Sequence, residues 1–331
     1  MLKTKKSSKI RYIVSIGISC IIIVCMIWKI GIGNFYTTLF KANLYLLLAA
    51  FFLSFLAIVN KLVRWSNLLR EAKTIDAYKI YLIGQAVNAI APIGTGELTR
   101  AYVAKTRLNI PVGKTLASAI IERVSDTTFL VALSVVCLTL LIPGNGYIWQ
   151  IAIPILILLA SYALLFNPHF LDRIAFISGR LFKKEEGGVN MIGARFSKSL
   201  MSFKGAILSF HGKKNIIAQT ILLTILAWSS YALCVLMLLL AFDTSVPIFY
   251  VLIIVCASSL LGTFSFVPGG LGVKEVSLAI LLSVVGIPFS IGMAIALIDR
   301  GMSYMQLGGG ALMSLMSFAM KNKKRVMKDF F

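Results

Sequence analysis

The sequence has few charged residues and few of the residues that build catalytic or metal sites. Of its 331 residues, 14% are charged and 59% are hydrophobic, whereas a soluble domain is about a quarter charged. The two histidines, His169 and His211, lie in one polar stretch, so we expect neither a metal cluster nor a cofactor. The five cysteines all lie in apolar runs, which argues against a disulfide framework. This composition excludes a soluble enzyme, a disordered chain and a disulfide-stabilised secreted domain.

Acidic residues are scarce as well. The chain has 12 Asp and Glu and 33 Lys and Arg, which gives a formal net charge of +21. In a soluble protein this excess would indicate a nucleic-acid partner. Here 24 of the 33 lie at the N-terminus and in residues 61–79, 167–215 and 321–331, whereas the loops near 33–43, 143–147 and 243–247 contain Lys41 alone. The positive-inside rule therefore predicts that the basic segments and both termini face the cytoplasm. Anionic lipid, and no nucleic acid, is the predicted partner of the 167–215 loop.

Long apolar runs predict an all-α, polytopic integral membrane protein with about seven to eight spans, since one span needs about 20 apolar residues. We read residues 1–331 as a single membrane domain, and the first run as a signal anchor that stays in the mature protein. The runs cover about 12–32, 43–63, 127–142, 148–166, 216–242, a segment from 248 onward, and 304–320, with a shorter one at 80–93.

Charged residues inside or beside these runs are the candidate functional residues. An ionised side chain costs at least about 2.5 kcal/mol at membrane depth, so such groups usually face a cavity or a partner. Glu122 and Asp126 are spaced i, i+4 and would share one helix face. The alternative is that the acid–arginine pairs have only a structural role, as ion pairs that hold helices together. The predicted substrate-groove residues are Glu97, Arg100, Glu122, Arg123, Asp126, Lys274, Glu275, Asp299 and Arg300.

The charged clusters also repeat along the chain. Glu97 precedes Arg123 by 26 residues and Glu275 precedes Arg300 by 25; each arginine follows an acid and is expected to open a span. The distribution of basic residues predicts that the span after Arg123 leaves the cytoplasm and that the span after Arg300 returns to it, so the two run in opposite directions. We therefore predict two inverted repeats with broken or re-entrant helices, at about 43–142 and 216–320, an arrangement typical of transporters. The predicted helix breaks are Pro92, Gly94, Gly96, Pro268, Gly269, Gly270 and Gly272.

Five motifs, in this order, resemble the flippase-like membrane region of lysylphosphatidylglycerol synthases. They are Arg64-Trp65, Pro92-x-Gly94-x-Gly96-Glu97-x-x-Arg100, Glu122-Arg123-x-x-Asp126, Pro268-Gly269-Gly270-Leu271-Gly272-x-x-Glu275 and Asp299-Arg300. In that family the region is thought to move aminoacylated phosphatidylglycerol between leaflets, and it also occurs as stand-alone proteins. Because the sequence ends at Phe331, a soluble aminoacyl-transfer domain and lysyltransferase activity are not expected.

The predicted function is translocation of a lipid with a polar or phosphate headgroup across the cytoplasmic membrane. The lipid would be an aminoacylated phosphatidylglycerol or a lipid-linked saccharide. Arginine suits phosphate because its forked donors bind two oxygens at once, and the acids would hold the arginines. One alternative is a membrane-embedded lipid-modifying transferase, although the apolar runs offer no Ser/His or Cys/His arrangement. Another is an accessory scaffold for a separate glycosyl- or aminoacyl-transferase.

Overall fold

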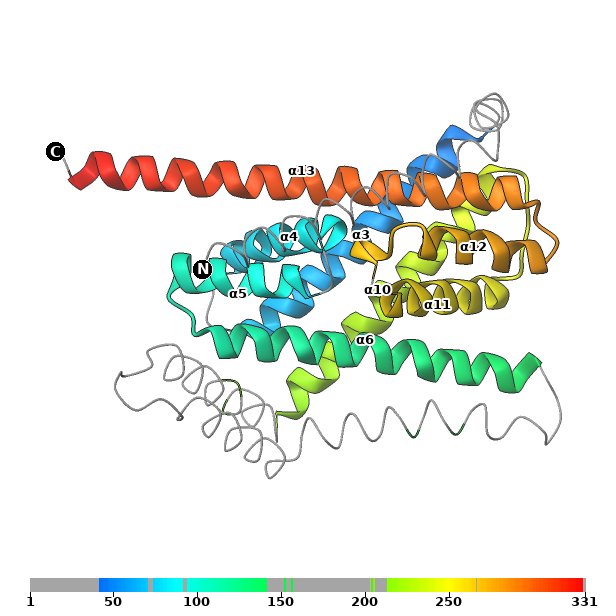
Figure 1. Ribbon diagram of the computed structural model, residues 1–331, viewed down its shortest axis with the longest axis horizontal. Coiled ribbons are helices and arrows are strands. Elements are labelled where there is room, and N and C mark those ends of the chain that lie inside the picture. The colour runs from blue at the N-terminus through cyan, green and yellow to red at the C-terminus, as the bar shows by residue number, and fades with distance from the viewer. Residues whose placement is uncertain are drawn as a thin grey trace, which may run out of the picture. The chain divides into compact units, whose positions relative to one another are not determined.

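The computed structural model describes residues 42–70, 74–91, 94–141, 213–265 and 267–329, with four single positions between 152 and 205. The described residues form helices and no strand, which confirms the all-α class (Figure 1). The predicted spans at 12–32 and 148–166 lie outside them, as does almost all of the 167–215 loop. The helices are α3 (Leu44–Leu69), α4 (Thr74–Ile90), α5 (Thr95–Leu108), α6 (Val112–Leu141), α10 (Lys214–Ala241), α11 (Ile248–Phe264), η2 (Pro268–Gly270), α12 (Val273–Val284) and α13 (Phe289–Asp329).

Two of the described helices, α3 and α10, are long and apolar enough to cross a membrane by length and composition. They contain 26 and 28 residues, or roughly 40 Å at about 1.5 Å per residue, against a hydrocarbon core of about 30 Å. Asn43 caps the start of α3, because its side-chain Oδ1 accepts the Tyr45 N–H at 3.0 Å. Both helices cover runs that the sequence predicts as spans.

The helices continue through charged residues that were expected at span ends. The predicted spans 127–142 and 304–320 are the later parts of α6 and α13, so Arg123 and Arg300 lie inside continuous helices and do not open them. Arg64, which the charge tally assigns to a basic loop, likewise lies within α3. Each of these arginines pairs with an acid on another helix, and this pairing makes the charge tolerable inside an apolar helix.

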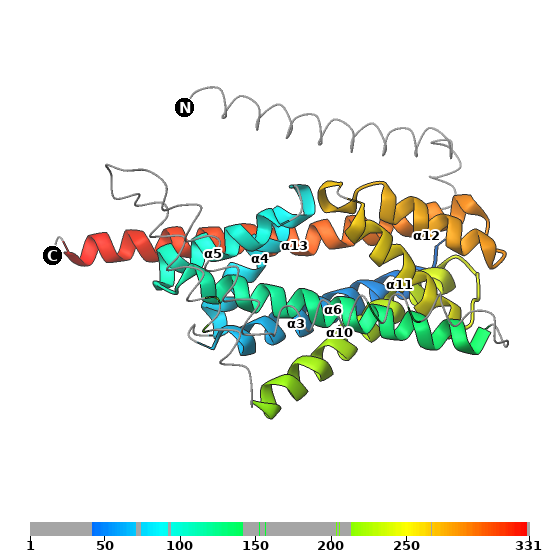
Figure 2. The same cartoon turned by 60° about the horizontal axis from the view of Figure 1, so that its bottom comes forward.

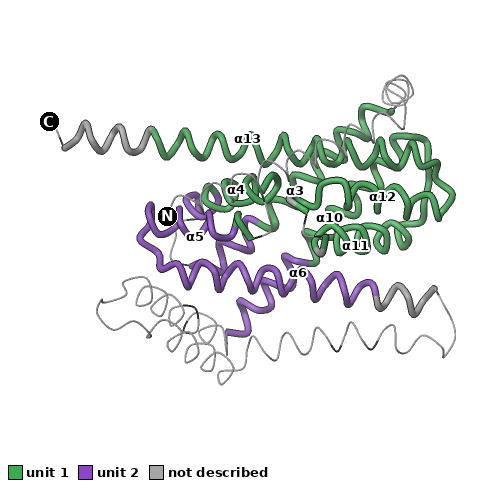
Figure 3. The backbone as a smooth tube through the Cα atoms, viewed as in Figure 1, with its two compact units in different colours: residues 1–61, 79–96, 225–331 green, residues 62–78, 97–224 purple. Residues whose placement is uncertain are grey.

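The chain divides into two compact units (Figure 3). Unit 1 comprises residues 1–61, 79–96 and 225–331, and unit 2 comprises residues 62–78 and 97–224. The predicted repeats follow chain order, whereas the compact units interleave segments, because α3, α4, α5 and α10 each contribute residues to both. The inverted repeats are compatible with this arrangement and stay a prediction.

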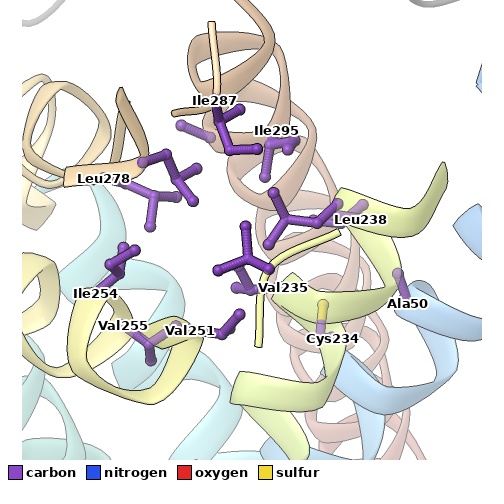
Figure 4. Close-up of a cluster of buried hydrophobic side chains, with 14 of the residues drawn as sticks. Ala50, Cys234, Val235, Leu238, Val251, Ile254, Val255, Leu278, Ile287 and Ile295 are labelled. Carbon is purple, nitrogen blue, oxygen red and sulfur yellow. The ribbon is translucent and has the colours of Figure 1, made fainter. Parts of the chain in front are cut away.

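Unit 1 has an apolar core to which α3, α10, α11, α12 and α13 all contribute (Figure 4). Val235 of α10, Val251 of α11, Leu282 of α12 and Ile295 of α13 are all 0% exposed. Within this unit α12 packs against both α11 and α13 (Figure 2). The core therefore holds the first turn of α12 beside α13, where four of the predicted site residues lie.

Both predicted helix breaks are present. The first lies between α4 and α5, where Gly94 has a φ of +84°; Pro92 itself lies outside the described residues. The second lies between α11 and α12, where Gly269, Gly270 and Gly272 all have positive φ, a conformation that glycine adopts without strain.

The second break packs against the end of α4 inside unit 1. A Cβ at Gly269 would lie 2.2 Å from the carbonyl oxygen of Ala89, so a side chain cannot fit there. The Tyr304 hydroxyl of α13 donates to the same oxygen at 3.4 Å, and Arg300 donates to the Gly269 carbonyl at 3.1 Å. The break is thus fixed between two helices.

Candidate functional site

In unit 2, Arg64 of α3 joins two carboxylates of α6. Its Nη1 donates to Asp126 Oδ1 at 2.7 Å and to the Thr224 hydroxyl at 2.6 Å. Its Nη2 donates to Glu122 Oε1 at 3.1 Å and to Asp126 Oδ2 at 3.0 Å. The i, i+4 spacing places both acids on one face of α6, as predicted. Arg64 is 0% exposed, so its charge depends on these partners.

Glu122 has a second arginine partner. Arg100 of α5 donates from Nη1 to Glu122 Oε2 at 2.8 Å, and its side chain is 1% exposed. The Arg100 guanidinium also lies 5.5 Å from the ring centre of buried Trp65, within the range of a cation–π contact. A single buried carboxylate is therefore held between two guanidinium groups.

The predicted pair of Glu97 and Arg123 forms on the more exposed side of this network. Arg123 donates from Nη2 and Nε to Glu97 Oε1 at 2.6 and 3.0 Å. The Arg123 side chain is 50% exposed and that of Glu97 is 13% exposed. Arg100 lies 3.7 Å from the same Glu97 oxygen, which links this pair to the buried part. Among the described residues, three arginines face three acids in the unit 2 network, so the formal charges of these six balance.

A similar network lies in unit 1. Arg300 of α13 donates from Nε to Glu275 Oε1 at 2.5 Å, and Lys274 Nζ lies 3.3 Å from Asp299 Oδ2. The other Glu275 oxygen accepts the Gly272 N–H at 2.7 Å, which is the acidic half of a capping box at the start of α12. The pair predicted from the 25-residue spacing therefore forms, and the unit 1 network is also charge-balanced.

Tyr231 of α10 is a member of the unit 1 network that sequence reasoning missed. Its hydroxyl donates to Asp299 Oδ2 at 2.8 Å, and Lys274 Nζ lies 4.7 Å from the centre of its ring. Tyr231 stands within an apolar run that gives no signal of this role. Arg64 was missed differently: its motif was noticed, but the residue was assigned to a loop.

All nine predicted groove residues are therefore ion-paired in the structure, five in unit 2 and four in unit 1. Two backbone N–H groups at the helix starts after the breaks are already hydrogen-bonded. The Gly96 N–H donates to Asn88 Oδ1 at 2.7 Å, and the Gly272 N–H donates to Glu275. Within the described part of the chain, no group of three or more His, Cys, Asp or Glu is placed to hold a metal ion.

Comparison with known proteins shows the family. Residues 12–310 match the family model described as the lysylphosphatidylglycerol synthase TM region. Similar proteins include UPF0104 membrane proteins of Methanothermobacter thermautotrophicus (24% identical, covering 94% of this chain and 97% of the relative) and Pyrococcus horikoshii (23%, 94% and 97%). Another, from Methanocaldococcus jannaschii, is 26% identical and covers 87% of this chain and 89% of the relative. Since the family model covers most of its length, the chain belongs to the family of the lysylphosphatidylglycerol synthase transmembrane region.

Proposed function

We propose that the chain is a lipid translocase, which moves the headgroup of a phosphate-containing lipid across the cytoplasmic membrane while the acyl chains stay in the bilayer. The observation that carries this proposal is the graded exposure of the cations in two charge-balanced networks. An ion pair that only holds helices together can be buried on all sides, whereas a cation that binds a ligand needs an exposed side.

In the unit 2 network the exposed cation is Arg123. Arg64 and Arg100 are 0% and 1% exposed, whereas Arg123 is 50% exposed. An exchange of Glu97 for a phosphate at Arg123 leaves Glu97 with a second cation, because Arg100 lies 3.7 Å from the same carboxylate oxygen. The same exchange at Arg64 would take the shared cation from buried Glu122 and half-buried Asp126. Arg123 is therefore the phosphate-binding residue we propose for this unit.

In the unit 1 network the cations are less exposed, with Lys274 at 23% and Arg300 at 15%. Arg300 is also hydrogen-bonded to the carbonyl of Gly269, which fixes its position. Lys274 has a flexible stem and a compact ammonium group that can turn between partners. We propose Lys274 as the phosphate-binding residue of unit 1, with Arg300 holding Glu275.

The surface beside Glu97 is apolar next to a charged pair, as contact with the acyl chains and the headgroup of a lipid requires. Leu98 and Tyr102, spaced i, i+4 on α5, are 60% and 69% exposed. They lie on the same helix as Glu97, so one helix presents both an apolar face and a charged pair. A lipid has the matching division between acyl chains and headgroup, and apolar side chains exposed together indicate contact with lipid or with another protein.

The test is a leaflet-exposure assay on purified protein in phosphatidylcholine vesicles. Fluorescent phosphatidylglycerol, lysylphosphatidylglycerol and a lipid-linked saccharide are each added as tracer, and a membrane-impermeant quencher reports the rate of transfer between leaflets. We expect faster transfer of at least one phosphate lipid than in protein-free vesicles, and a reduced rate in Arg123→Ala. Folded protein that accelerates none of the tracers would contradict the proposal. A chemically altered tracer, detected by mass spectrometry, would instead favour a transferase.

A further inference from the structure

The two networks hold their central acids with different chemistry. Glu122 is held by Arg64 and Arg100, and a guanidinium does not give up its proton in proteins. Asp299 is held by Lys274 and Tyr231, an ammonium and a hydroxyl. Asp299 therefore lacks the two guanidinium partners that Glu122 has.

Asp299 is buried with one of its oxygens poorly satisfied. The residue is 3% exposed, and both partners, Lys274 and Tyr231, bind the same atom, Oδ2. The other oxygen, Oδ1, is buried and accepts no hydrogen bond from the described residues. A buried carboxylate oxygen without a hydrogen bond is costly, and protonation of the group removes its charge.

Among the titratable groups in this part of unit 1, Asp299 is the one that can take up a proton. The titratable or charged groups that face it are Tyr231 and Cys234 on α10, Lys274 on α12 and Arg300 on its own helix. The tyrosine and the thiol are neutral when protonated, and the lysine and the arginine already carry their protons. The nearby acid Glu275 has both oxygens occupied, by Arg300 and by the Gly272 N–H. Of this set, Asp299 is the group that gains a proton and becomes neutral.

Charge balance couples that proton to an anionic ligand. If Lys274 turns from Asp299 to a phosphate, it leaves a carboxylate buried without its cation, which is strongly unfavourable. A proton taken up by the Asp299 carboxylate forms one O–H bond and cancels this charge. Lys274 stays an ammonium ion throughout, so one phosphate charge and one proton enter together and the network remains balanced.

We infer that Asp299 is a proton-binding site coupled to phosphate binding at Lys274, so that the translocase moves an anionic phosphate lipid together with a proton. This inference rests on the proposed function. It predicts that the transfer of fluorescent phosphatidylglycerol in vesicles accelerates as the pH falls from mildly alkaline to mildly acidic, and that an acidic donor side drives net transfer.

Three variants test the assignment. Asp299→Asn cannot titrate, so its transfer rate should not depend on pH. Tyr231→Phe removes a hydrogen bond to the carboxylate, so the measured pH of half-maximal transfer rate should move upward. The matched control is Asp243→Asn in the α10–α11 loop, an exposed position with φ of +52° that asparagine tolerates. It should keep the wild-type pH profile. A flat wild-type profile, or an unchanged one in Asp299→Asn, would overturn the inference while the translocase proposal stands.

A second readout separates the inference from the proposed function. Infrared spectra of the wild type and of Asp299→Asn, each with the same phosphatidylglycerol vesicles, should differ by a protonated carboxyl band, because the subtraction cancels the ester carbonyl band of the lipid; without lipid the two proteins should not differ in this band. If the wild type moves no lipid, the proposed function fails and this band decides the inference, which is overturned if no band appears. If Asp299→Asn does not fold, as judged by its melting temperature, the pH shift in Tyr231→Phe decides it.

Discussion

Arg64 and Glu122 lie 58 residues apart in the chain and form an ion pair of 3.1 Å, with side chains 0% and 4% exposed. The pair is the buried part of a network in which Glu122 also binds Arg100. Because the pair is enclosed by protein, we assign it to folding, and we assign ligand binding to the partly exposed Arg123.

Removal of Arg64 is expected to destabilise the protein severely. Arg64→Ala leaves Glu122 and Asp126 without the cation that they share, which typically costs about 3–5 kcal/mol. The matched control is Lys105→Ala, at an exposed position near the end of α5 whose hydrogen bond to Asn109 is also exposed, where little change is expected. Thermal unfolding of the detergent-purified proteins, followed by intrinsic fluorescence, measures the difference. Equal melting temperatures for the two variants would show that Arg64 has no such structural role.

Arg123 and Arg100 should separate transport from folding. Both pair with acids of the unit 2 network, but their side chains are 50% and 1% exposed. We expect Arg123→Ala to keep most of its thermal stability and lose lipid transfer, and Arg123→Lys to be impaired as well because the fork that binds phosphate is lost. Arg100→Ala should lose stability first. If Arg123→Ala transfers lipid at the wild-type rate, its pair with Glu97 is a packing contact.

Glycine substitutions should distinguish the helix break from the long final helix. In Gly269→Ala the new methyl group would meet the Ala89 carbonyl at 2.2 Å, at a φ of +59°, so we expect a large drop in melting temperature. Gly309 lies inside α13 with nothing within 4 Å of an added Cβ. Gly309→Ala should be neutral or stabilising by up to about 1 kcal/mol, since alanine favours helix. A mild effect at Gly269 would mean that the break is not held tightly against α4.

The predicted orientation can be checked by cysteine labelling. On a background without the five native cysteines, single cysteines in the 167–215 segment should react with an impermeant reagent in inside-out vesicles and not in intact cells. A cysteine within 143–147 should show the opposite pattern. Labelling of the 167–215 segment from outside intact cells would reverse the orientation and remove the basis of the inverted repeats.

Several features of the fold follow from local pattern alone. Apolar runs predicted α10 to within two residues and the start of α3 to within one, whereas α3 continues to Leu69, beyond the predicted end at 63. Clusters of proline and glycine in the sequence predicted the breaks, and Gly94, Gly269, Gly270 and Gly272 have positive φ in the structure. The starts of α6 and α13 were missed, since Arg123 and Arg300 were expected to open their spans and lie instead inside these helices. A charge ends an apolar run in the sequence, but it does not end the helix, and Arg123 and Arg300 pair with acids on neighbouring helices.

The sequence by itself determined the membrane class, the helix breaks and the spacings that join Glu97 to Arg123 and Glu275 to Arg300. These features depend on residue type and on separation along the chain, both of which the sequence displays. Apolar runs indicate the membrane class, and glycines mark positions where the backbone can adopt a positive φ. Only the tertiary structure decided that Arg64 is buried and that Tyr231 binds Asp299, because both contacts bring distant helices together. It also decided which cations are exposed, since exposure depends on what every neighbouring helix covers.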